Sequence, residues 1–238
     1  MRIEGILFDK DGTLLDYDAT WAPLNRQAAL EAAGGDAAVA ERLLVAGGYD
    51  PARDSHQPNS LLVSASNDVI AGSWAAMLGA DPAELTARIT RIFEASSAET
   101  AVAVPGMAAV LAALKGRGLT LGVATNDSED SAYASLQPFG VLEHFSYVAG
   151  FDSGHGAKPG PGMVEAFCRS SGLAPAAVAV VGDSHHDMEM GRAAGAGLLV
   201  GVLTGTGGRD DLAPFAHHVL DSVLELEALL DQVAGQQG

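Results

Sequence analysis

Short apolar segments, each about the length of one strand, recur along this chain and constrain its fold more than any other feature. Glycine or charged residues bound them, which is typical of strands buried on both faces, as in a parallel sheet. The clearest lie at 3–8, 119–124, 178–182 and 197–202, and weaker ones at 145–150 and 217–220. Helical patterns lie between the later segments at 106–117, 128–136, 161–171 and 187–194, and another follows at 222–233. This alternation predicts an α/β fold with a doubly wound parallel sheet and right-handed crossovers.

Residues 17–100 interrupt this rhythm and predict a second domain. They contain no convincing strand, but helical patterns occur at 21–33, 36–46, 67–79 and 82–95. The last has a clear start, with Asp81 as the N-cap and Pro82 at the first helical position. We therefore expect a core domain of residues 1–16 and 101–238 with an inserted helical cap domain at 17–100. Ligands of open α/β sheets bind at the carboxyl ends of the strands, so an insertion after the first strand is placed to act as a lid.

The composition limits the partners that we expect. Apolar residues make up 48% of the 238 residues, which is enough for a sizeable core. The formal net charge of −17 argues against nucleic-acid and anionic-membrane partners, because both call for a basic face. The single cysteine, Cys168, cannot form an internal disulfide, and we expect it in the core or on a helix surface. No signal-peptide pattern or membrane-length apolar run is visible, so a cytoplasmic location is expected.

Polar residues follow the strands that we expect near the centre of the sheet. They are Asp9, Asp11, Gly12 and Thr13 after the first strand, Thr125 and Asn126 after the second, Asp183 and Asp187 after the strand at 178–182, and Lys158 in the loop GHGAKPGPG. Because the carboxyl ends of parallel strands meet at one edge, these groups would converge there. Close carboxylates repel one another, which favours a bound cation, and hard oxygen ligands favour Mg²⁺. Mg²⁺ and Lys158 together would give a locally positive field that suits a phosphoryl group.

The order of these segments resembles the haloacid dehalogenase superfamily, in its phosphoglycolate-phosphatase-like branch with a helical cap. The matching segments are DKDGTL, ATND, AKPGP and GDSHHDMEMGRAAGAG, and the likeness spans nearly the whole chain. The resemblance implies a magnesium-dependent phosphatase that hydrolyses a small phosphorylated metabolite, phosphoglycolate-like or a sugar phosphate, through an aspartyl-phosphate intermediate. The dehalogenases of the superfamily lack an acid at the position of Asp11, because a halide leaves without a proton.

The resemblance also implies roles for the residues of the first segment. Asp9 would attack phosphorus and form the covalent intermediate. Asp11 would protonate the leaving oxygen and then deprotonate the water that hydrolyses the intermediate. Gly12 would permit the turn, and Thr13 would help to orient Asp11.

The other matching residues would bind phosphate and metal. Thr125 and Asn126 would hold phosphoryl oxygens, and Lys158 would bridge the nucleophile and the phosphate. The implied magnesium ligands are Asp9, the main-chain carbonyl of Asp11, and Asp183. Asp187 would anchor this metal site without binding the metal directly.

Rival functions remain open at this point. A phosphomutase of the same superfamily would pass the phosphoryl group to a sugar hydroxyl, and the sequence does not settle this alternative. A phospho-accepting signalling domain also uses acids, a threonine and a lysine on a parallel sheet, but it needs neither a long insertion nor Asp11. An inactive binding module is disfavoured, because every catalytic residue type is present.

Two further segments, 47–60 and 204–208, contain residues that could contact a substrate. The segment GGYDPARDSHQPNS, residues 47–60, is the longest part of the insertion without helical character, so it can lie as a loop. Arg53 within it could grip a carboxylate of the leaving group through its planar guanidinium, and an ordinary surface arginine fits the pattern at least as well. The segment TGTGG, residues 204–208, resembles a phosphate loop. No lysine follows it, so a surface loop is expected.

Overall fold

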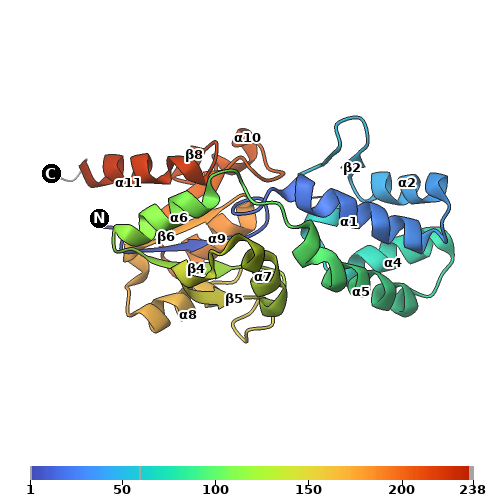
Figure 1. The fold of residues 1–238 in the computed structure, drawn as a ribbon, viewed down its shortest axis with the longest axis horizontal. Coiled ribbons are helices and arrows are strands. Elements are labelled where there is room, and N and C mark those ends of the chain that lie inside the picture. The colour runs from blue at the N-terminus through green and yellow to red at the C-terminus, as the bar shows by residue number, and fades with distance from the viewer. Residues whose placement is uncertain (1, 59, 236–238) are drawn as a thin grey trace. The chain divides into compact units, whose positions relative to one another are not determined.

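The computed structural model describes residues 2–58 and 60–235. Asn59, within the loop expected at 47–60, and both ends of the expected core domain, at residues 1 and 236–238, lie outside the described residues. The chain divides into two compact units, one of Met1–Asp16 with Ala103–Gly238 and the other of Tyr17–Val102 (Figure 1). We describe each unit by itself.

The first unit is built on a six-stranded sheet in the order β5-β4-β1-β6-β7-β8. Neighbouring strands are parallel throughout, and β1 pairs with both β4 and β6. The strands are β1 (Gly5–Phe8), β4 (Thr120–Ala124), β5 (Phe145–Ala149), β6 (Val178–Gly182), β7 (Leu198–Val202) and β8 (His218–Leu220). They lie where the apolar segments predicted them. The predicted doubly wound parallel sheet is confirmed.

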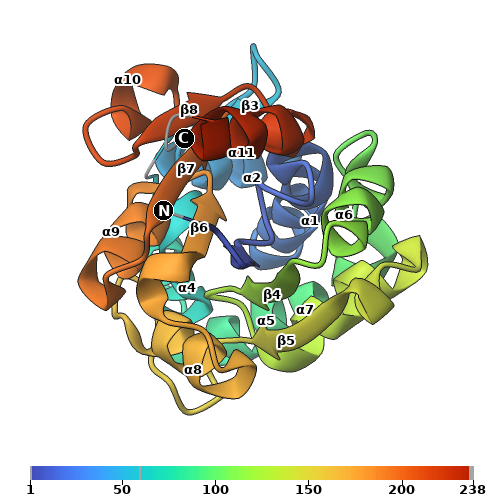
Figure 2. The same cartoon turned by 90° about the vertical axis from the view of Figure 1, so that its left-hand side faces the viewer.

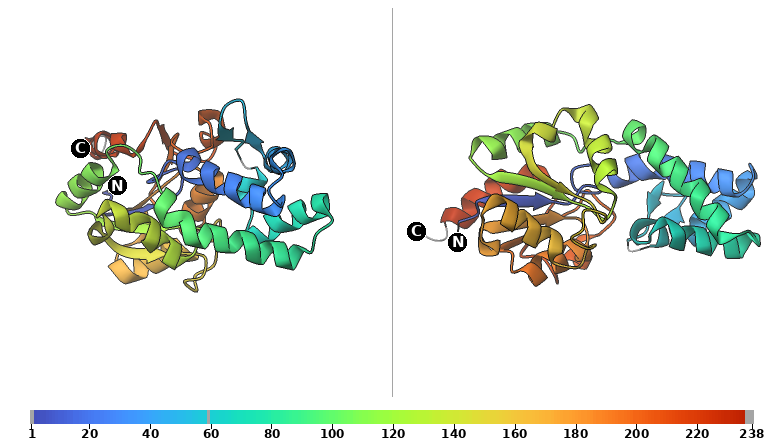
Figure 3. Two further views of the ribbon diagram at one scale, coloured as in Figure 1. Left: turned by 45° about the vertical axis from the view of Figure 1, so that its right-hand side comes forward. Right: turned by 90° about the horizontal axis from the view of Figure 1, so that it is seen from below.

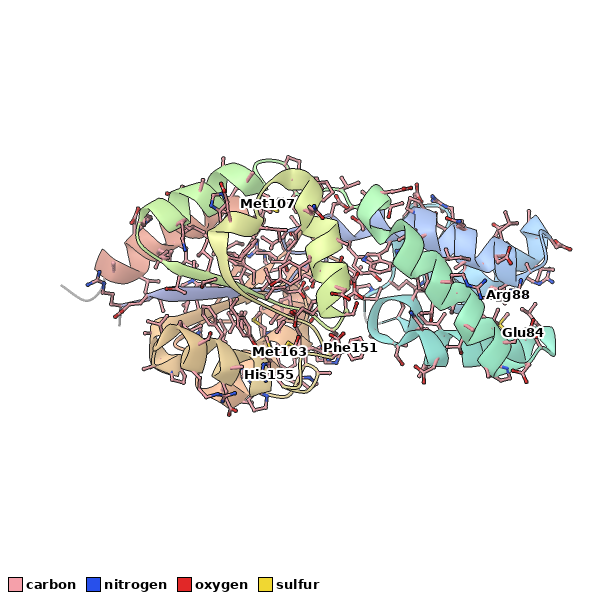
Figure 4. All side chains as sticks on the ribbon, turned by 60° about the horizontal axis from the view of Figure 1, so that its bottom comes forward. Glu84, Arg88, Met107, Phe151, His155 and Met163 are labelled. Carbon is pink, nitrogen blue, oxygen red and sulfur yellow. The ribbon has the colours of Figure 1, made fainter. Side chains whose placement is uncertain are left out.

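Helices cover both faces of this sheet. Figures 2 and 3 show α6, α7 and α11 on one face and α8 and α9 on the other. Their bounds are α6 (Met107–Gly116), α7 (Glu129–Leu136), α8 (Gly162–Ser171), α9 (His185–Ala194) and α11 (Leu226–Gly235), and a short α10 spans Arg209–Leu212. Figure 4 labels Met107 on α6 and Met163 on α8, on opposite sides of the sheet, and both side chains are buried. This two-sided cover explains why the strands read as continuous apolar runs.

The second unit is mainly helical. Its helices are α1 (Tyr17–Ala32), α2 (Ala37–Ala46), α3 (Leu61–Ser64), α4 (Asn67–Leu78) and α5 (Pro82–Thr100). Its core surrounds Trp74, which is fully buried and whose indole N–H donates to the Leu43 carbonyl at 3.1 Å. The expected cap of α5 is present, because Asp81 Oδ1 accepts the backbone N–H of Glu84 at 2.9 Å. Within the described residues, no helix is long and apolar enough to cross a membrane.

A small hairpin occurs in the segment 47–60, where the sequence indicated no strand. β2 (Tyr49–Asp50) pairs antiparallel with β3 (Ser55–His56). The side chain of His56 is buried, and its Nδ1 lies 2.7 Å from Asp18 Oδ1 in the first turn of α1. A strand of two residues is too short to show the alternation of apolar and polar residues that identifies a strand in a sequence. Tertiary contacts such as that of His56 with Asp18 hold this hairpin in place instead.

Candidate active site

Asp9 lies at the point where the central strand β1 leaves the sheet. Its backbone N–H donates to the carbonyl of Val181 at 2.8 Å, so the pairing of β1 with β6 continues one residue beyond β1. The chain then turns sharply, and the backbone N–H groups of Leu14 and Leu15 both donate to the carbonyl of Lys10, at 2.9 and 3.0 Å. Asp9 is therefore held by the sheet on one side and by a closed turn on the other.

Gly12 is the residue that this turn needs. Its φ is 83°, in the left-handed region that side chains rarely adopt. A Cβ at Gly12 would also lie 2.4 Å from Asp183 Oδ2, at the end of the neighbouring strand β6. The glycine thus permits both the turn and the close approach of the two acidic segments.

Three buried acids meet at this edge of the sheet. One carboxylate oxygen from each of Asp9, Asp183 and Asp187 lies within 4.8 Å of the others. Burial raises the pKa of Asp9 to about 7, with Lys158 opposing that rise and Asp187 and Asp11 adding to it. Burial, together with the charges of Asp9 and Asp187, raises the pKa of Asp183 well above its ordinary value. The cluster therefore holds more negative charge than its protein neighbours offset.

Lys158 is the cation of the cluster. Its Nζ donates to Asp9 Oδ1 at 2.5 Å and to Asp187 Oδ1 at 2.6 Å. Burial alone would lower the pKa of Lys158, but the two carboxylates outweigh that effect and raise it, so the side chain stays protonated. Asn126 fixes the backbone of Lys158, because its Oδ1 accepts the Lys158 N–H at 2.8 Å and its Nδ2 donates to the Lys158 carbonyl at 3.2 Å.

Asp187 already has partners for both of its carboxylate oxygens. Oδ1 accepts from Lys158, and Oδ2 accepts the backbone N–H of Ser184 at 3.1 Å and its hydroxyl at 2.6 Å. The contact with Ser184 forms a capping box at the start of α9. This arrangement suits a residue that anchors a metal site better than one that binds the metal.

The donor atoms that remain fit a magnesium ion. Asp9 Oδ2 is buried and has no hydrogen-bond partner among the described residues. Asp183 Oδ2 accepts one long hydrogen bond, from the backbone N–H of Thr206 at 3.3 Å. A hard cation with one or two carboxylate ligands would use these oxygens and offset their charge.

Thr13 and Thr125 are both buried at this edge. The hydroxyl of Thr13 has no hydrogen-bond partner within the described part of the chain. Thr125 lies at the end of β4, where its backbone N–H donates to the Ala149 carbonyl at 3.0 Å and its Oγ1 accepts the backbone N–H of Asp127 at 3.1 Å. The predicted phosphate-binding hydroxyl is therefore fixed by the sheet and by the turn that follows.

The loop at 204–208 differs from the surface loop that we expected. Thr204 Oγ1 donates to the carbonyl of Gly12 at 2.7 Å, and the N–H of Thr206 reaches Asp183. A Cβ at Gly205 would lie 1.7 Å from Asp183 Oδ2. The glycines of this loop thus allow it to pack against the acid cluster. The loop follows β7, the neighbour of β6, so it begins at the same carboxyl edge of the sheet as the other functional segments, and this position in the sequence indicated its place in the site.

Lys10 and Asp127 are the second feature that the sequence analysis missed. Lys10 is 1% exposed, and its Nζ lies 2.6 Å from Asp11 Oδ2 and 3.3 Å from Asp127 Oδ2. The sequence did contain an indication of this contact, because Lys10 stands between two acids, Asp9 and Asp11, directly after an apolar strand.

Arg53 lies in the turn between β2 and β3, in the second unit. Its side chain is 82% exposed, and its Nε lies 3.8 Å from Asp50 Oδ2. An exposed pair at this distance restrains a side chain only weakly. A role for Arg53 toward a substrate stays a prediction.

Comparisons with known proteins identify the class. The sequence model of the haloacid dehalogenase-like hydrolase family matches residues 3–195 of this chain. The chain therefore belongs to the haloacid dehalogenase-like hydrolase family. The N-acetylmuramic acid 6-phosphate phosphatase of Pseudomonas putida is 30% identical over 196 residues, which cover 82% of this chain and 81% of that protein.

Two further similarities agree with this family. The phosphoglycolate phosphatase of Escherichia coli is 34% identical over 119 residues, 48% of this chain and 47% of that enzyme. A crystal structure described as a "predicted phosphoglycolate phosphatase" of Haemophilus somnus has a TM-score of 0.76 at 20% identity, covering 96% of this chain and 98% of that one. The predicted family and the predicted class, a phosphoric monoester hydrolase, are confirmed.

Proposed function

We propose that this hydrolase is a magnesium-dependent phosphatase that passes the phosphoryl group of a small phosphorylated metabolite to Asp9 and then to water. One observation carries the proposal. Asp9 combines a carboxylate oxygen 2.5 Å from the Lys158 ammonium with a second oxygen that is buried and without a hydrogen-bond partner among the described residues. We assign Oδ2 to the metal and Oδ1, beside the ammonium, to the attack on phosphorus, and Lys158 favours the ionised carboxylate against the rise in pKa that burial causes.

In the first step an oxygen of Asp9 attacks phosphorus and the bond from phosphorus to the leaving oxygen breaks. The electron pair of that bond goes to the leaving oxygen, which takes the proton of the Asp11 carboxyl group. The products are an aspartyl-phosphate and a free alcohol. General acid catalysis of this kind typically contributes about 10²–10⁴-fold.

In the second step Asp11, now a carboxylate, takes a proton from a water molecule. The water oxygen attacks phosphorus, the bond to Asp9 breaks, and its electron pair returns to the Asp9 carboxylate. The same residue thus acts first as an acid and then as a base. Inorganic phosphate leaves, and the enzyme is ready for another substrate.

The remaining residues hold the transferring group. Lys158 offers an ammonium beside the nucleophile, and the Thr125 hydroxyl offers a further donor at the same edge. Asn126 contributes by fixing the backbone of Lys158, in addition to the direct phosphate contact that the resemblance implies. When bound by Asp9, Asp183 and the carbonyl of Asp11, Mg²⁺ would supply positive charge that stabilises the phosphoryl oxygens.

The names of the relatives support a substrate class, and we propose that the second unit selects among substrates of that class. The Pseudomonas relative is named for a phosphorylated sugar acid, and the Escherichia coli relative for a two-carbon phosphorylated acid. Both names describe small phosphate monoesters that also carry a carboxylate. We infer that the substrate of this chain is a phosphorylated acid or sugar of that size, with residues 17–100 acting as the cap.

A phosphate-release screen tests the proposed function. The purified protein is assayed with N-acetylmuramic acid 6-phosphate, phosphoglycolate and a set of sugar phosphates, each with Mg²⁺ and with excess chelator. We expect Mg²⁺-dependent release of inorganic phosphate from at least one of them. Transfer of the phosphoryl group between sugar hydroxyls without net release of phosphate would instead indicate a mutase.

A further inference from the structure

Lys10 is a buried cation that neither proposed step uses. Its side chain is 1% exposed, and it reaches two carboxylates, Asp11 Oδ2 at 2.6 Å and Asp127 Oδ2 at 3.3 Å. With a carboxylate partner on either side, the ammonium of Lys10 places a positive charge beside the group that is proposed to carry the proton.

Asp127 is itself held firmly at the start of α7. Its Oδ1 accepts the backbone N–H of Ser128 at 2.9 Å, and its Oδ2 accepts the hydroxyl of Ser131 at 2.6 Å. The carbonyl of Asp127 also accepts the backbone N–H of Phe151 at 3.0 Å. A carboxylate with this many partners has a fixed position, so it can serve as an anchor for the ammonium of Lys10.

The backbone fixes the position of Asp11, the second carboxylate that Lys10 contacts. Lys10 and Asp11 lie in the closed turn after β1, where Asp11 forms a bridge with Leu15 and the N–H of Gly12 donates to the Leu15 carbonyl at 2.7 Å. The backbone places the Asp11 side chain near the site, and the ammonium of Lys10 then selects its orientation. Without Lys10, the carboxylate of Asp11 would be drawn toward Lys158 and toward a bound metal ion, since both are cations.

We propose that Lys10 is a positioning residue that holds Asp11 for proton transfer, and that Asp127 is the anchor of Lys10. The inference rests on the proposed function. In the first step the Asp11 carboxyl gives its proton to the leaving oxygen and becomes a carboxylate, which the neighbouring ammonium stabilises. Lys10 matters most when the leaving oxygen needs a proton, and least when it leaves readily as an anion.

Leaving-group dependence therefore separates this role from simple structural support. Lys10→Met removes the charge and keeps an apolar side chain of similar length. We expect kcat/KM for an alkyl phosphate to fall about 10²-fold, at the lower end of a general-acid contribution. For p-nitrophenyl phosphate we expect kcat/KM to fall no more than about fivefold, because nitrophenolate leaves without protonation. Lys115→Met, at an exposed lysine near the end of α6, is the matched control and should leave both values unchanged.

A charge-balanced double variant addresses the possibility that Lys10→Met damages the fold by leaving Asp127 unpaired. Lys10→Met with Asp127→Asn removes one positive and one negative charge together. If Lys10 only neutralised Asp127, the double variant would recover wild-type activity on both esters. If Lys10 positions Asp11, the double variant should keep the selective loss on the alkyl ester.

The readouts keep this inference distinct from the proposed function. Wild-type turnover of the two esters measures the proposed phosphatase activity, whereas the ratio of the two losses in a folded variant measures the role of Lys10. Circular dichroism and the melting temperature of each variant confirm that it is folded. Equal losses on both esters in the double variant, or no loss on either, would overturn the proposal.

Discussion

Lys158 Nζ lies 2.5 Å from Asp9 Oδ1, although the two residues are 149 positions apart in the chain. The contact joins the end of the central strand β1 to the loop between β5 and α8, and a second contact at 2.6 Å joins the same ammonium to Asp187 in α9. One side chain thus brings the separate strand ends into a single site. Among the described residues, Asp183 is the acid of the cluster that has no contact with a lysine. We therefore place the metal ion beside Asp183.

Magnesium should be required for turnover, and calcium should inhibit it. Calcium accepts more ligands at longer distances than magnesium, so it can draw both oxygens of Asp9 onto the metal and prevent its attack. Phosphate release is measured against Mg²⁺ concentration, with and without added Ca²⁺. Full activity in excess chelator would refute the metal assignment.

Asp11→Asn should leave the nucleophile intact but remove the group that moves the proton. We expect kcat for ordinary alkyl esters to fall about 10²–10⁴-fold. With an activated aryl ester the first step should survive better than the second, so a burst of the phenol product should precede slow release of phosphate. Stopped-flow assays of both products check this. Equal losses of the first step for alkyl and aryl esters would count against Asp11 as the acid.

Gly205→Ala should weaken magnesium binding, because a methyl group there would lie 1.7 Å from Asp183 Oδ2 and force that carboxylate to move. Changes that disturb the orientation of a metal ligand typically cost about 10–100-fold in affinity. Mg²⁺ affinity is measured by titration calorimetry, independently of turnover. Gly116→Ala is the matched control, since a Cβ at Gly116 meets nothing within 4 Å. A folded Gly205→Ala protein with wild-type Mg²⁺ affinity would show that the loop has no part in the metal site.

Arg53→Ala tests the only residue of the insertion to which the sequence analysis gave a substrate role. If Arg53 grips the carboxylate of the leaving group, its loss should raise KM for a carboxylate-bearing substrate at least about fivefold, with little change for p-nitrophenyl phosphate. KM values for both substrates are compared. The Arg53 side chain is 82% exposed, which also fits an ordinary surface arginine. Equal changes in KM for the two substrates would show that Arg53 has no role in binding the carboxylate.

The sequence predicted the sheet and the strand ends well, because both depend on local patterns. Runs such as GILF and VAVVG are apolar on both faces, and the carboxyl ends of parallel strands must share one edge. The hairpin at 49–56 has strands of two residues, so it leaves no period to detect. Lys10 and the loop at 204–208 were missed for a different reason. Their contacts cross between strands, and a charged residue or a glycine run does not show from its own position which neighbour it will meet.

Phosphorylation of Asp9 is the most direct test of the whole account. The protein is mixed with its best substrate, quenched in acid and treated with borohydride, which reduces an acyl phosphate to an alcohol, and the peptides are then sequenced by mass spectrometry. We expect the reduced side chain at position 9 and nowhere else, with more of it in Asp11→Asn, where hydrolysis of the intermediate is slow. Asp9→Asn should give no reduced residue and no turnover, because an amide cannot attack phosphorus, while its circular dichroism stays that of the wild type. Steady phosphate release by Asp9→Asn, or a reduced residue at another position, would contradict Asp9 as the nucleophile.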